Sequence, residues 1–204
     1  MIGTRRERSD VAMLRVLLIR TGATEYDCQG RIQGTLDVPL SEDGRQQVER
    51  AAEQLSEAAN SVKALYSGPG RSAQQTADIL GEKLGLKSKT LEKLRNLDQG
   101  LWQGMLVQEV KSKQPKVYRQ WSERPDTVCP PQGETLNSAR ERLQDVLAKL
   151  ARKHKTGDIA LVLPDPLASV LRSILRDDDV SRLWDVKSLD KPLWEPIALL
   201  PASG

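Results

Sequence analysis

Short apolar segments that alternate with longer amphipathic segments constrain the fold of this chain more than any other feature. Val16–Ile19, Val62–Tyr66 and Ile159–Leu163 have the length and composition of buried strands. Segments of helical length separate them, for example from Ser41 to about Ala59. Strands that alternate with helices favour a mostly parallel sheet covered by helices on both faces. Because Ile159–Leu163 is apolar throughout, we expect this strand in the centre of the sheet.

Weaker signals complete the predicted order of elements. A turn at Ser67–Gly70 opens a helix that continues through Leu84, and a second long helix runs from Thr135 or Asn137 to about Lys153. The remaining segments are a short strand at Thr90–Leu94, a helical insertion at about Val107–Trp121, a helix at Pro166–Leu175, and weak strands at Val186–Leu189 and Pro196–Leu200.

The length of 204 residues suits one well-buried core and is short for two full domains. Arg5, Arg6 and Arg8 precede any hydrophobic segment. We therefore expect a flexible N-terminal tail at residues 1–13 and a single α/β domain at residues 14–204.

Charge and composition exclude several classes of function. The net charge of +3 and the spread of the basic residues argue against nucleic-acid binding. No apolar run approaches the roughly 20 residues of a membrane span. Cys28 and Cys129 lack the spacing of a metal site or a disulfide framework. We expect a cytoplasmic protein without cofactor, metal or membrane contact.

Polar residues follow the predicted strands at their carboxyl ends, where open parallel sheets bind ligands. Arg20 and Thr21 leave the first strand, Ser67 to Arg71 the second, and Pro164 and Asp165 the strand after the long helix. The turn before Arg71 also offers free backbone N–H groups at a helix start. These features together indicate an anion site.

Six segments follow one another along the chain: Leu17–Tyr26, Gly30–Gly34, Asp37–Ser41, Tyr66–Ala77, Leu94–Gly104 and Gly133–Thr135. Together they resemble the histidine phosphatase superfamily, whose members are phosphoglycerate-mutase-like. The family pattern begins with Arg-His-Gly-x-Thr, continues with Gly-Arg-x-Gln-Gly and Asp-x-Pro-Leu, and later includes a second phosphate-binding segment, a segment with the catalytic acid, and a Gly-Glu-Ser turn. The resemblance covers about residues 14 to 175 and implies a three-layer α/β sandwich.

The resemblance also implies a mechanism that this chain cannot follow. Family members use a histidine nucleophile, arginines and a second histidine around the phosphate, and a glutamate acid. The nucleophile position is Thr21, the acid position is Asn96, and the second histidine falls at Asp165, or at Pro164 in a shifted alignment. The sequence holds one histidine, His154, at the end of a predicted helix, where we interpret it as a cation favoured by the helix dipole.

The phosphate-binding positions are Arg20, Arg71 and Asp27, the last standing where the family has an asparagine that donates to phosphate. Partly buried arginines need neutralising partners. Asp27 and Asp165 could form ion pairs with the two arginines, or the arginines could hold phosphate or another anion. We favour the ion pairs.

These departures favour a catalytically inactive pseudoenzyme that binds a phosphorylated small molecule or a protein partner at a remnant phosphate pocket. The alternative is a phosphomonoester phosphatase or phosphoglycerate-mutase-type enzyme with a non-histidine nucleophile, for which Asp165 and Cys28 are candidates. A second alternative is a structural oligomerisation module, a dimer included, with Trp102, Trp121, Trp184 and Trp194 as interface anchors or, more simply, as core residues.

Overall fold

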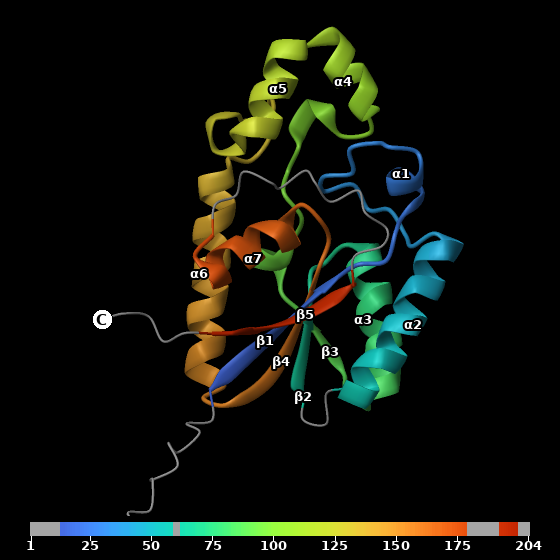
Figure 1. Ribbon diagram of the computed structural model, residues 1–204, viewed down its shortest axis with the longest axis vertical. Coiled ribbons are helices and arrows are strands. Elements are labelled where there is room, and N and C mark those ends of the chain that lie inside the picture. Colours follow the sequence, from blue (N-terminus) through green and yellow to red (C-terminus); the bar gives the residue numbers. More distant parts are fainter. Residues whose placement is uncertain (1–12, 59–61, 179–191, 200–204) are drawn as a thin grey trace, which may run out of the picture.

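The computed structural model describes residues 13–58, 62–178 and 192–199. Its described strands form one sheet in the order β3-β2-β4-β1-β5, with β4 in the middle (Figure 1). β5 runs antiparallel to β1, and the other neighbouring pairs are parallel. The strands are β1 (Leu14–Arg20), β2 (Val62–Ser67), β3 (Ser88–Thr90), β4 (Gly157–Leu163) and β5 (Trp194–Ala198). The predicted central position of the Ile159–Leu163 strand is confirmed.

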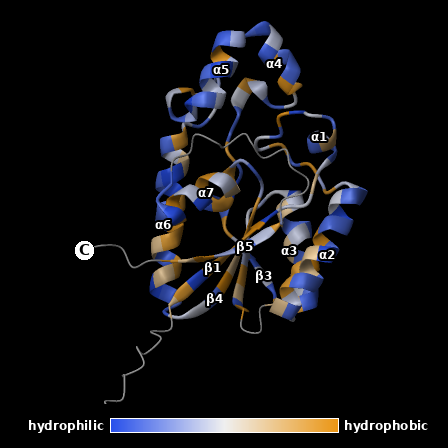
Figure 2. Ribbon diagram, viewed as in Figure 1, coloured by the Kyte–Doolittle hydropathy of each residue, from blue (hydrophilic) through white to orange (hydrophobic). Residues whose placement is uncertain are grey.

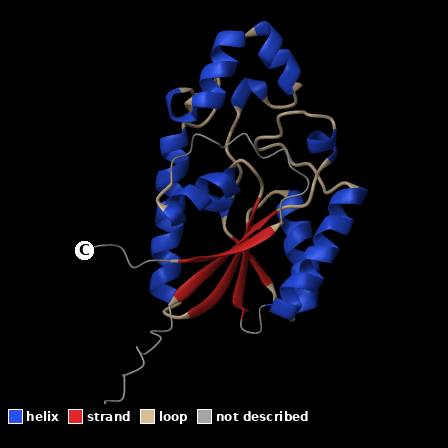
Figure 3. Cartoon of the chain, viewed as in Figure 1, coloured by secondary structure: helices blue, strands red, loops and turns tan. Residues whose placement is uncertain are grey.

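Helices cover both faces of the sheet and make three layers (Figures 1 and 3). α2 (Glu42–Ala58) and α3 (Arg71–Leu84) lie on one face, and α6 (Leu136–Lys153) and α7 (Leu167–Arg176) on the other. Successive side chains of a strand point to opposite faces of the sheet, which gives each helical layer an apolar surface to cover. In β1, Val16 and Leu18 belong to the core on the α6 side. Leu17 and Ile19 belong to the core on the α2 side. The expected mostly parallel three-layer α/β sandwich is confirmed.

Hydropathy follows the same layering. The strands are mostly apolar, whereas the helices carry hydrophilic residues along much of their length (Figure 2). Ile159 and Leu161 on one face of β4, and Ala160 and Val162 on the other, are fully buried. Burial on both faces of β4 is what its uniformly apolar sequence requires. No helix within the described ranges is long and apolar enough to span a membrane.

A cap of short helices lies beyond the carboxyl ends of the parallel strands (Figure 1). It contains α1 (Glu25–Cys28), α4 (Val107–Lys113) and α5 (Pro115–Glu123). Trp102 and Trp121 are buried here and meet edge to face, with ring centroids 5.5 Å apart. These two tryptophans therefore pack the cap and are not exposed interface anchors. Trp194 lies half-buried on β5, and Trp184 falls outside the described residues.

Two sequence predictions fail near the third strand and the C-terminus. The segment Thr90–Leu94 is not a strand, because β3 ends at Thr90 and a 3₁₀ turn (Glu92–Leu94) follows. The turn closes through a hydrogen bond from Leu94 N to Leu91 O and buries Leu94 completely. The last strand begins at Trp194, earlier than predicted. The expected strand at Val186–Leu189 and tail residues 1–12 lie outside the described part.

Candidate active site

The sheet brings the predicted ligand-binding residues to one edge. β4 lies between β1 and β2, with Arg20 opposite Leu163 and Ser67 opposite Val162. Thr21 N donates a hydrogen bond to Leu163 O at 3.2 Å, which places the loop after β1 beside the end of β4. Parallel pairing thus gathers the carboxyl ends of three strands.

Two glycines hold the loop after β1 in place. A Cβ on Gly22 or on Gly44 would collide with backbone atoms of the other segment, so the loop packs directly against the start of α2. Gly22 N also donates to Thr76 Oγ1 of α3 at 3.3 Å. These contacts fix the position of Thr21 between the helices and the sheet edge.

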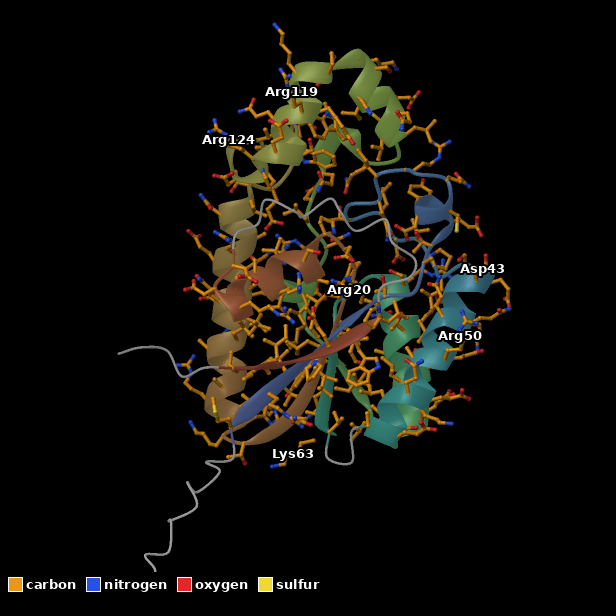
Figure 4. The ribbon with its side chains drawn as sticks, viewed as in Figure 1. Arg20, Asp43, Arg50, Lys63, Arg119 and Arg124 are labelled. Atoms are coloured by element: carbon orange, nitrogen blue, oxygen red, sulfur yellow. The ribbon has the colours of Figure 1, made fainter. Side chains whose placement is uncertain are left out.

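Arg20 and Asp165 form an ion pair at this edge. Arg20 Nε lies 3.0 Å from Asp165 Oδ2, and the two side chains are 17% and 19% exposed. The Nε–H is not aligned for a hydrogen bond to that oxygen, so charge attraction makes the contact. Arg20 Nη1 makes a long hydrogen bond of 3.5 Å to Pro192 O. Figure 4 shows Arg20 in the middle of the molecule, at the end of β1.

Asp165 is held on its other side by the first turns of α7. Its Oδ1 accepts hydrogen bonds from Ser169 N at 3.2 Å and Ser169 Oγ at 2.9 Å. Burial raises the pKa of Asp165 above the usual aspartate value, and the charge of Asp27 adds to this rise, while Arg20 and Ser169 oppose it. Although part of the side chain remains accessible, desolvation outweighs the arginine, and the carboxylate is more basic than usual.

Asn96 acts as a structural clamp beside this pair. Its Nδ2 donates to Gly34 O at 2.9 Å and to Asp165 O at 3.1 Å, and its Oδ1 accepts from Leu97 N at 2.9 Å. Because both amide hydrogens are engaged and the residue is buried, Asn96 holds the backbone of Asp165 against the loop at Gly34. An amide has no proton to give a leaving group.

Asp27 does not pair with either arginine. Its Oδ2 accepts from Thr24 N at 2.8 Å and from Thr24 Oγ1 at 2.7 Å, and so caps α1. Its negative charge still acts on Asp165. The favoured hypothesis of two ion pairs is therefore correct for Arg20 with Asp165 and wrong for Asp27, because the local helix cap takes that carboxylate.

Arg71 begins α3, and its backbone N donates to Asp37 Oδ1 at 2.7 Å. Asp37 lies in the Asp-x-Pro-Leu segment, but nothing in the sequence pointed to it as the carboxylate at this helix start. Within the described residues the Arg71 guanidinium is exposed and has no carboxylate partner. The second arginine therefore remains available to an anion.

A buried ion pair between α6 and the Gly-Glu-Ser-like turn supports the Asn96 segment. Arg142 of α6 binds both carboxylate oxygens of Glu134 at 2.7 and 2.8 Å. The same guanidinium donates to Lys93 O at 2.6 Å and to Asn96 O at 3.3 Å. The resemblance to a Gly-Glu-Ser turn singled out Glu134, but nothing in the sequence pointed to Arg142 as its partner.

The other candidate groups lie apart from the ion pair. Cys28 is exposed at the end of α1, and Cys129 is exposed in a loop. His154 follows the last residue of α6 and contacts Tyr66, with the phenol oxygen 2.8 Å from Nε2. In the described part of the chain, no three His, Cys, Asp or Glu side chains gather in a way that could hold a metal ion.

Comparison with known proteins gives consistent matches. A family model described as "Histidine phosphatase superfamily (branch 1)" matches residues 16–191. Phosphoserine phosphatase 1 of Hydrogenobacter thermophilus is 31% identical over 84% of this chain and 81% of its own. Phosphoglycerate mutase-like protein 4 of Arabidopsis thaliana is 31% identical over 98% and 93%. A solved mycobacterial glucosyl-3-phosphoglycerate phosphatase with VO3 is 28% identical, with a TM-score of 0.79 over 91% of this chain and 90% of that chain.

These relatives overturn one expectation. The interpretation as a catalytically inactive binding or scaffolding protein is wrong, because relatives that span most of the chain are named as phosphatases. That interpretation assumed that a chain without the two family histidines has no catalytic activity. The structure keeps an arginine at the sheet edge and places a carboxylate of raised pKa beside it.

Proposed function

Because the chain belongs to the histidine phosphatase superfamily, we propose that it hydrolyses phosphomonoesters of small molecules, with Asp165 as nucleophile in place of histidine. The observation that carries this proposal is the 3.0 Å contact between Arg20 Nε and Asp165 Oδ2. A phosphoryl group held by Arg20 would lie within reach of that oxygen. The mycobacterial relative solved with VO3, a phosphate-like anion, supports a ligand of this kind.

In the proposed reaction the phosphoryl group is transferred in two steps, first to Asp165 and then to water. Asp165 Oδ2 forms a bond to phosphorus while the ester P–O bond breaks, which gives an acyl phosphate and an alcohol whose oxygen takes a proton from water. A water molecule then attacks phosphorus and loses a proton, which neutralises the hydroxide left by the first step. The bond to Oδ2 breaks, and inorganic phosphate leaves with Asp165 restored. Arg20 and Arg71 offset the charge on the equatorial oxygens in both steps.

The lack of a general acid at the Asn96 position determines which substrates should react fastest. The only histidine in the sequence, His154, is bound to Tyr66 on another part of the fold, and Asn96 cannot protonate a leaving oxygen. Without an acid at Asn96, leaving groups that depart as stable anions react faster. We expect aryl phosphates to be hydrolysed faster than alkyl phosphates of similar size.

Replacing Arg20 with alanine tests the proposal. Loss of this cation removes the main contact to the phosphoryl oxygens, and we expect hydrolysis of p-nitrophenyl phosphate to fall by about 10²–10³-fold. The control is Arg50→Ala, which makes the same change on the exposed outer side of α2 (Figure 4). Equal turnover by the purified wild type, Arg20→Ala and Arg50→Ala proteins would attribute the activity to a contaminant and refute the proposal.

The pH dependence of hydrolysis gives a second test. Asp165 must be ionised to attack, and its pKa is raised, so activity falls as the pH drops through a value above the ordinary aspartate range of about 3.9. Asp27→Asn removes a charge that raises this pKa and moves the acid limb of kcat/KM to lower pH. Ser169→Ala removes a hydrogen bond that lowers it and moves the limb to higher pH. Limbs that stay in place in both variants would exclude Asp165 as the titrating group.

A further inference from the structure

A cluster of basic side chains lies around His154, which follows the last residue of α6. α6 runs antiparallel to its neighbouring strands, so its last residue, Lys153, lies near the amino end of β4 at Gly157. Figure 4 shows Lys63 at the foot of β2, far along the sheet from Arg20. Lys63 Nζ donates to Thr156 O at 3.1 Å, which joins β2 to the segment between α6 and β4.

Tyr66 forms the floor of this cluster. It is 2% exposed, and its hydroxyl lies 2.8 Å from His154 Nε2, with the two rings in edge contact at 5.9 Å. Lys153 Nζ lies 5.7 Å from the centre of the Tyr66 ring. Lys89 of β3 is directly opposite Tyr66 in the parallel register, so both side chains project from the same face of the sheet.

The cluster is not neutralised by the protein. Lys63, Lys89 and Lys153 are exposed, and none of the three forms an ion pair with a carboxylate within the described residues. By contrast, Arg15 pairs with Asp158 and Lys93 with Asp145. Three unpaired ammonium groups around one imidazole create a concentrated positive potential.

His154 responds to this potential. Burial lowers its pKa, and the charges of Lys153, Lys89 and Lys63 lower it further. The carboxyl end of α6 would by itself favour a charged imidazole. Burial and the lysines therefore work against the interpretation of His154 as a cation at a helix end.

We propose that Lys63, Lys89, Lys153 and His154 form a binding site for a compact multivalent phosphate anion, separate from the candidate active site. The three ammonium groups supply charge, and the Tyr66–His154 pair supplies a preorganised imidazole that gains a proton as the anion binds. The convergence of the charges on one imidazole favours a compact ligand over an extended acidic protein segment, which would match a broader basic surface.

The single histidine makes a direct experiment practicable. In untagged protein the imidazole proton signals in an NMR spectrum come from His154 alone. Inorganic pyrophosphate, added against sodium chloride of equal ionic strength, is expected to shift these signals with saturation and to raise the pKa of His154. Lys89→Gln and Lys153→Gln should each weaken pyrophosphate binding about tenfold, whereas Lys113→Gln on α4, which lies in the cap, should not.

Three results would overturn the site. The first is a His154 titration that pyrophosphate leaves unchanged at equal ionic strength. The second is equal weakening by Lys113→Gln and Lys89→Gln, which would indicate a general charge effect. The third is tighter binding of a glutamate-rich peptide than of pyrophosphate in the same titration, which would replace the compact anion with an acidic protein segment.

Discussion

Asp165→Asn is expected to lower kcat for phosphomonoester hydrolysis by on the order of 10³-fold or more, because an amide cannot form the acyl phosphate. The same substitution should tighten the binding of inorganic phosphate. In the wild type, phosphate must displace Asp165 from Arg20, where Oδ2 lies 3.0 Å from Nε. Removal of that negative charge leaves Arg20 to the ligand, and we expect binding at least roughly tenfold tighter.

A lower kcat together with tighter phosphate binding distinguishes a chemical role of Asp165 from a structural one. Turnover is measured with p-nitrophenyl phosphate and phosphate binding by calorimetry at the same pH. Asp43→Asn is the matched control, because it removes the same charge from an exposed residue in the first turn of α2 (Figure 4). A variant that loses both turnover and phosphate binding would point to local unfolding, and one that keeps full turnover would refute Asp165 as nucleophile.

The second large effect concerns stability. Arg142→Met leaves Glu134 buried without its bidentate partner, and we expect a loss of about 3–5 kcal/mol in the free energy of unfolding. Both side chains of the pair are at most 8% exposed. Arg95, whose Nη2 lies 3.7 Å from Glu134 Oε1, is half exposed and replaces little of this interaction. The substitution also removes the hydrogen bonds that Arg142 donates to Lys93 O and Asn96 O, in the segment that carries Asn96.

Urea unfolding followed by circular dichroism measures this loss. Lys93→Gln breaks the exposed pair with Asp145 and should cost far less, because solvent screens that contact. Glu134→Gln combined with Arg142→Met should recover part of the stability, since no buried charge is then left alone. Equal losses for Arg142→Met and Lys93→Gln would contradict the assigned role of the buried pair.

The sequence predicted the parts of the fold that depend on local apolar patterning. A uniformly apolar run identified β4 as the central strand, and strand alternation in β1 explained the two helical layers. The carboxyl ends of the strands also placed Arg20 and Asp165 at one edge before any contact was known. Because open parallel sheets bind ligands at the carboxyl ends of their strands, the residues that follow each strand in the sequence indicate the site.

The partners of individual charges could not be predicted in the same way. Asp27 caps its own short helix, Asp37 binds the backbone at Arg71, and Arg142 reaches back to Glu134. Each choice depends on side-chain geometry between segments that the sequence leaves unrelated. The function was mispredicted for a related reason. Residue types at the family positions show which catalytic groups are missing, but they do not show which other groups the fold places beside Arg20.

Trapping of a phosphorylated enzyme tests the central claim most directly. Protein that is turning over a radiolabelled phosphomonoester is quenched in acid, treated with borohydride, which reduces an acyl phosphate to homoserine, and digested for peptide mass spectrometry. We predict acid-stable, hydroxylamine-sensitive label and homoserine at position 165. Label on Thr21 or Cys28, or steady turnover with inversion at phosphorus and no phosphorylated enzyme, would contradict the account.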